Sequence, residues 1–93
     1  NQESTFYARV SGDSMIDAGL DDGDLIIIDR SLDPVNGKIA VCFIDGEFTV
    51  KRINKREGKL YLKPENKNYE EIEINDGNEL RIWGIVTFVI KKI

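Results

Sequence analysis

Apolar and polar residues alternate with a period of two along most of this sequence, and no stretch keeps a helical period over ten or more residues. Neighbouring side chains of a β-strand point to opposite faces of a sheet, so this period is typical of half-buried strands. The strand-like stretches are residues 6–10, 25–28, 39–44, 47–53, 60–62, 71–74, 80–83 and 85–90. They predict an all-β fold of about seven short strands, with twisted antiparallel sheets forming a partly open barrel.

Turn-forming residues separate these stretches. Asp45-Gly46 lies between two β-rich stretches and predicts a tight hairpin, because glycine tolerates the positive φ of such a turn. Gly84 divides the last two stretches and predicts a bulge or bend. The one short helical candidate is residues 14–18, which Gly19 ends. We expect a single domain over residues 1–93, with residues 1–5 as the remnant of a flexible arm.

The composition excludes several kinds of chemistry. The chain has no histidine, which rules out Ser-His-Asp and Cys-His catalysis and most zinc or iron sites, so we expect no metal and no other cofactor. Its single cysteine, Cys42, cannot form an internal disulfide and is expected to pack in the core. The apolar stretches are far shorter than the roughly 20 residues of a membrane helix, so no membrane contact is expected.

Charge is spread unevenly, although the net charge is only −4. Residues 13–33 are rich in aspartate, and residues 51–67 are rich in lysine and arginine. Two interpretations fit this pattern: an ordinary solvated surface, or two electrostatic docking faces for a protein partner. The acidic run Asp21-Asp22-Gly23-Asp24 lacks the spacing of a calcium-binding EF-hand loop, so it is interpreted as a turn.

Ser14 is the first candidate for chemistry. It follows a predicted strand, and Gly12 allows the backbone to turn sharply, which would present the serine beside backbone amides able to face an oxyanion. The alternative is that Ser11 or Ser14 caps the short helix.

Lys51 is the second candidate. Strand alternation places Thr49, Lys51 and Ile53 on one face, so the lysine is expected to be partly buried. Burial lowers the pKa of an ammonium group and can give a neutral base near pH 7. The alternative is an edge lysine that reaches back to water. A Ser–Lys pair is a serine-hydrolase arrangement that needs no histidine.

The two candidates together resemble the C-terminal peptidase domain of the LexA/UmuD family. Ser14 and Lys51 are 37 positions apart (51 − 14), as in the family pattern. The resemblance extends over nearly the whole chain. The segments that match are residues 11–15, Gly19, residues 22–24, 45–52, 62–66 and 84–86.

This resemblance implies a mostly β domain that forms a homodimer in the bacterial cytoplasm and acts in the SOS response. It implies Ser14 as the nucleophile, Lys51 as the general base and Thr49 as the residue that orients Lys51. The Ser14 amide, with that of Asp13 or Met15, would form the oxyanion hole. The expected partner is the activated RecA–single-stranded DNA filament, which stimulates family members to cut themselves at an Ala-Gly or Cys-Gly bond upstream of the domain.

Within the family, residues 12–17 and 45–51 look closer to UmuD than to LexA. A UmuD-like protein, once trimmed, forms a dimer that joins an error-prone Y-family polymerase in translesion synthesis. The alternative is the self-cleavage and dimerisation domain of a LexA-like or phage repressor. No helix-turn-helix is recognisable, so direct DNA binding by this domain is not expected. No Ala-Gly or Cys-Gly pair precedes Ser14, so the chain is expected to lack its own cleavage site.

Two other classes remain open. A signal-peptidase relative also uses Ser and Lys but normally carries a membrane anchor. A non-catalytic dimeric interaction module would use the same fold only for binding. Trp83 is expected in the core or an interface, and residues 85–90 could pair with a second copy as an exposed edge.

Overall fold

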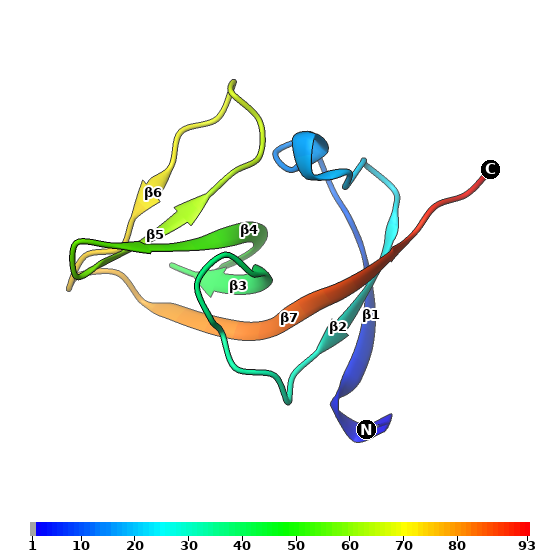
Figure 1. Cartoon of the computed structure of the whole chain (residues 1–93), viewed down its shortest axis with the longest axis horizontal. Coiled ribbons are helices and arrows are strands. Elements are labelled where there is room, and N and C mark those ends of the chain that lie inside the picture. Colours follow the sequence, from blue (N-terminus) through cyan, green and yellow to red (C-terminus); the bar gives the residue numbers. More distant parts are fainter. Residues whose placement is uncertain (1) are drawn as a thin grey trace.

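Seven β-strands form the framework of residues 2–93, the part of the chain that the computed structural model describes (Figure 1). In chain order they are β1 (Thr5–Arg9), β2 (Leu25–Asp29), β3 (Ile39–Ile44), β4 (Glu47–Arg56), β5 (Lys59–Lys63), β6 (Ile72–Glu73) and β7 (Leu80–Ile90). Two short 3-10 helices, η1 (Gln2–Ser4) and η2 (Ile16–Ala18), are the other regular elements of this part. The all-β prediction is confirmed.

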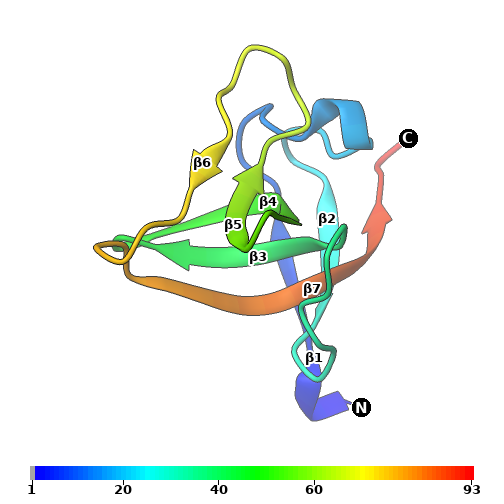
Figure 2. The same ribbon diagram turned by 60° about the vertical axis from the view of Figure 1, so that its left-hand side comes forward.

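The strands form one antiparallel sheet in the order β1-β2-β7-β3-β4-β5-β6, which is not closed into a barrel. β7 joins its two parts: the first half of this long strand pairs with β3 and the second half with β2 (Figures 1 and 2). The sheet bends at β7, so the β1-β2 pair and the β3-β4 pair stand at an angle to each other (Figure 2). Residues 85–90 were expected at an edge. Ile85 pairs with both β2 and β3, whereas the rest of this stretch pairs with β2 on one side and has no β3 partner on the other.

The bend in β7 coincides with a bulge next to Gly84, as the sequence predicted. Val41 pairs with Gly84 and Cys42 with Ile82, which leaves Trp83 as the extra residue. Gly84 also lies so close to β2 that an added Cβ would come 2.5 Å from Cγ2 of Ile28. The absence of a side chain here allows β2 and β7 to approach.

Two tight hairpins arrange the strand that carries Lys51. Asp45 and Gly46 both have positive φ, 47° and 90°, and connect β3 to β4 as predicted. A second turn with positive φ at Glu57 and Gly58, 51° and 74°, connects β4 to β5 and was not anticipated. It lets β4 continue to Arg56, three residues beyond the expected end at Ile53.

The apolar interior consists of two clusters. Met15 belongs to the first, with Val10, Leu20, Ile26, Ile28 and Val41. Ile53 belongs to the second, with Ala40, Cys42, Leu62 and Ile85. Cys42 is fully buried, as its position in mid-strand suggested. Ser14 therefore directly precedes Met15, which is anchored in the first cluster. Lys51 lies two residues before Ile53, which is anchored in the second cluster.

The start of the chain has secondary structure where the sequence suggested a flexible arm. Gln2–Ser4 form η1, the Ser4 carbonyl accepts a hydrogen bond from the Arg30 amide at 2.8 Å, and Thr5 already pairs with Asp29 in the sheet. Asn1 lies outside the described residues. None of the helices in residues 2–93 has the length and apolar character needed to span a membrane.

Candidate active site

Ser14 lies in a sharp turn between β1 and η2. Gly12 allows this turn with a φ of +85°, and its amide donates a 2.7 Å hydrogen bond to the Asp22 carboxylate. Met15 fixes the far side of the turn, because its side chain is only 2% exposed. Met15 is the N-cap of η2, and no side chain caps that helix. Ser14 is therefore not a helix cap in this structure, and its hydroxyl is available to another partner.

Lys51 supplies that partner from β4. Its Nζ donates to Ser14 Oγ at 3.1 Å, to Thr49 Oγ1 at 2.6 Å and to the Val50 carbonyl oxygen at 3.1 Å. The residue is 8% exposed, so it does not reach back to water. The alternation of β4 explains the arrangement, because it places Thr49 and Lys51 on the same face. The structure thus brings together Ser14, Thr49 and Lys51.

The surroundings of Lys51 favour the neutral amine. Burial lowers the pKa of Lys51 below its ordinary value, and only the charge of an ionised Cys42 thiolate would oppose this, in part. Burial also raises the pKa of the Cys42 thiol to about 11, so at neutral pH this thiol is uncharged and provides no counter-ion. A neutral lysine has a lone pair, which can accept the Ser14 hydroxyl proton across the same 3.1 Å contact.

The other predicted site residues, Asp13 and Met15, flank Ser14 in the same turn. The Asp13 carbonyl accepts a hydrogen bond from Asn66 Nδ2 at 2.9 Å, and its carboxylate accepts one from the Tyr69 hydroxyl. The Met15 side chain is in the core, so only its amide can face a substrate. Among residues 2–93, the amides of Ser14 and Met15 have no hydrogen-bond acceptor.

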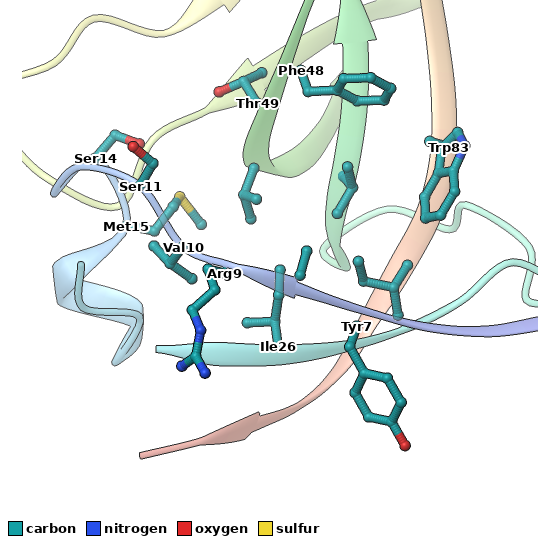
Figure 3. Close-up of a pocket in the computed structure, with 14 residues that line it drawn as sticks. Tyr7, Arg9, Val10, Ser11, Ser14, Met15, Ile26, Phe48, Thr49 and Trp83 are labelled. Atoms are coloured by element: carbon teal, nitrogen blue, oxygen red, sulfur yellow. The ribbon is translucent and has the colours of Figure 1, made fainter. Parts of the chain in front are cut away.

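A groove of about 420 Å³ begins at Ser14 and follows β1. Figure 3 shows Ser11, Ser14 and Met15 near one end, Trp83 at the other, and Phe48 and Thr49 above β1. β1 is an edge strand that pairs only with β2, so its other side is open to a further strand. The lining is mostly apolar and comprises Tyr7, Ala8, Arg9, Val10, Ser11, Ser14, Met15, Ile26, Ile28, Val41, Phe48, Thr49, Val50 and Trp83.

Trp83 was expected in the core or an interface; the structure packs it against the first apolar cluster, where it also lines this groove. Its ring makes edge-to-face contacts with Phe6 at 5.1 Å and Phe48 at 6.5 Å between centroids, and the Arg30 guanidinium lies 4.4 Å from the ring centre. Trp83 is the extra residue of the β7 bulge, and its place in the groove lining was not expected from the sequence.

Some residues of the charged stretches form ion pairs within the chain. Arg52, Arg56 and Lys59 of the basic stretch form ion pairs with Glu65, Glu71 and Glu73. Lys91 forms ion pairs with Asp21 and Asp24. Within the described residues, no three His, Cys, Asp or Glu side chains gather in a way that could hold a metal ion.

Comparison with known proteins gives one family and several relatives. A family model described as Peptidase S24-like matches residues 1–87. The LexA repressor of Caldicellulosiruptor saccharolyticus is 45% identical over 91 residues, which are 98% of this chain and 44% of that protein. The LexA repressor of Clostridium perfringens is 51% identical over 71 residues, 76% of this chain and 35% of the relative.

Protein MucA of Escherichia coli is 45% identical over 85 residues, which are 90% of this chain and 58% of MucA. The chain therefore spans less than two thirds of the length of each of these relatives. These matches agree with the resemblance to the LexA/UmuD family that the sequence motifs suggested.

Proposed function

Since this chain belongs to the Peptidase S24-like family, we propose that it is a serine peptidase domain in which Ser14 is the nucleophile and Lys51 the general base. The observation that supports this most directly is the 3.1 Å contact between Lys51 Nζ and Ser14 Oγ at the end of an apolar groove. A lysine that is 8% exposed and has a lowered pKa is suited to the role of a neutral base.

The reaction begins with proton transfer. Neutral Lys51 takes the hydroxyl proton as Ser14 Oγ attacks the carbonyl carbon of a peptide bond, which gives a tetrahedral oxyanion and a lysine ammonium. The ammonium then gives its proton to the departing amine, and the C–N bond breaks. Water later hydrolyses the acyl-serine by the same route, with Lys51 again as the base.

Two further roles follow from the surroundings of the dyad. Thr49 Oγ1 and the Val50 carbonyl accept hydrogen bonds from Nζ, which holds the amine in place while its third position faces Ser14. The Ser14 amide, with the amide of Met15 or Asp13, stabilises the oxyanion. The substrate is an extended peptide that lies in the groove as an added strand beside the open edge of β1.

For the whole protein we propose self-cleavage in the SOS response, in the cytoplasm, stimulated by the activated RecA–DNA filament. The first form of this proposal is a UmuD-like protein whose processed dimer serves an error-prone Y-family polymerase. The second is a repressor, and the match of a LexA repressor to 98% of the chain favours it. The residues upstream of Asn1 distinguish them: a helix-turn-helix domain indicates a repressor, and a short arm with Ala-Gly or Cys-Gly indicates UmuD.

Homodimer formation belongs to the same proposal. Tyr7, Ile27 and Phe88 lie side by side in register across β1, β2 and β7, and Tyr7 and Phe88 are 66% and 67% exposed. A second copy that pairs with residues 86–90 of β7 would cover this apolar row. Sedimentation over a dilution series tests it, and a chain that stays monomeric at high concentration would contradict it.

Labelling with a fluorophosphonate, a reagent that reacts with activated serines, tests the peptidase proposal. Ser14 Oγ should form a bond to phosphorus with loss of fluoride, and mass spectrometry should locate the adduct on Ser14. Ser11→Ala is the matched control, because Ser11 also lines the groove, and its labelling should equal that of the wild type. Ser14→Ala should not be labelled. An unlabelled wild type would favour the non-catalytic interaction module instead.

A further inference from the structure

The loop between β5 and β6 packs against the turn that carries Ser14. The Glu65 amide donates to the Ser14 carbonyl at 2.9 Å, and the Asp17 amide donates to the Glu65 carbonyl at 2.8 Å. These two backbone bonds hold the turn on both sides of Met15. Residues 62–66 were part of the family resemblance, yet the proposed chemistry gives them no role.

Asn66 adds a third bond from a buried side chain. It is 6% exposed, and its Nδ2 donates to the Asp13 carbonyl at 2.9 Å. Its Oδ1 accepts a 2.9 Å hydrogen bond from the Asn68 amide, which fixes the orientation of the carboxamide. A buried amide with both ends bonded in this way has little freedom to move.

The acceptors of these bonds determine where the neighbouring amides point. In a trans peptide unit the C=O and the following N–H are coplanar and point in opposite directions. The bond from Asn66 to the Asp13 carbonyl therefore directs the Ser14 N–H away from Asn66. The bond from the Glu65 amide to the Ser14 carbonyl likewise directs the Met15 N–H away from Glu65. Both amides remain without an acceptor in residues 2–93.

The same loop is tied to the strand of the base. The Glu65 carboxylate forms an ion pair with Arg52, which follows Lys51 in β4. Arg52 also donates to the Gly37 carbonyl at 2.6 Å, which limits its movement. One loop thus contacts both the turn of Ser14 and the strand of Lys51.

We propose that Asn66 is a positioning residue, which orients the Ser14 amide as an oxyanion donor by holding the Asp13 carbonyl. The inference rests on the proposed function of Ser14 as a nucleophile. Glu65 acts in the same way on the Met15 amide through its own backbone, so Asn66 is the member of the pair that substitution can test.

The test is the rate of fluorophosphonate labelling as a function of pH in Asn66→Asp. This change keeps the side-chain shape but removes the Nδ2 donor, so the Asp13 carbonyl keeps only the longer 3.3 Å hydrogen bond from the Ile16 amide. We expect the maximal rate to fall about tenfold or more, because removal of an oxyanion donor in other enzymes costs a hundredfold or more. In Asn66→Ala, which adds no charge near the dyad, the pH midpoint should stay that of the wild type, since Asn66 has no bond to Lys51. Asn68→Asp is the matched control: Asn68 is exposed, and this variant should react like the wild type.

Thermal unfolding separates positioning from stability. Rates are compared well below the unfolding temperature of every variant, where a merely structural role would leave the rate of the folded protein unchanged. Asn66→Ala, which removes the donor without adding a charge, should show the same loss if Asn66→Asp folds poorly. A normal rate in a folded Asn66 variant overturns the positioning role alone. An unreactive wild type overturns the proposed function and this inference with it.

Discussion

Lys51 is a buried lysine whose Nζ lies within hydrogen-bond distance of three uncharged groups. Strand alternation was enough to place Thr49 and Lys51 on one face, and spacing within the family was enough to pair Lys51 with Ser14. Asn66 could not be found in this way. Its partner, the Asp13 carbonyl, is 53 positions away and belongs to the backbone, so no pattern of side chains indicates the contact.

The lowered pKa of Lys51 predicts how stability changes with pH. Between the folded-state pKa and the higher unfolded-state pKa, the unfolded chain binds more protons, so the free energy of unfolding rises with pH. Lys51→Met keeps the length of the side chain and removes this contribution. Chemical denaturation from about pH 7 to about pH 10 should show the wild type gaining stability relative to the variant. A difference that does not change with pH would mean that Lys51 titrates like an exposed lysine.

At the scale of secondary structure, local turn chemistry decides how much can be predicted. Asp45-Gly46 and Gly84 were recognised because glycine marks positions that a side chain would disturb. The turn at Glu57-Gly58 was missed because a glutamate with positive φ is uncommon and gives no clear pattern. As a result the strand predicted over residues 47–53 ended too early, although the strand that pairs with its end was predicted at residues 60–62.

Gly84 provides the test at this scale. Gly84→Ala would place a Cβ 2.5 Å from Cγ2 of Ile28, whose side chain is buried and cannot move away freely. We expect the free energy of unfolding to fall by about 1–3 kcal/mol, measured by urea denaturation. Gly77→Ala is the control, because nothing lies within 4 Å of the added Cβ, and its stability should stay close to that of the wild type. Equal stability of the two variants would contradict the close packing of β2 on β7.

At the scale of the whole molecule, the sheet order brings the residues of the candidate site together. Periodicity identifies strands but not their neighbours, so the position of the last strand, β7, between β2 and β3 was not predictable from the sequence. This order leaves β1 as an open edge beside a groove and brings the turn after β1 to β4. Three residues of the basic stretch, Arg52, Arg56 and Lys59, form ion pairs with carboxylates of the same chain.

The most direct test of the Ser14–Lys51 mechanism is self-cleavage as a function of pH. The chain is extended upstream of Asn1 to include its own cleavage segment, and the cut fraction is followed on gels for the wild type, Ser14→Ala and Lys51→Ala. The wild-type rate should rise with pH and level off as Lys51 loses its proton, because only the neutral amine can accept the serine proton. Both variants should remain folded and uncut. A wild-type rate that does not change with pH, or a Lys51→Ala protein that still cuts itself, would contradict the mechanism.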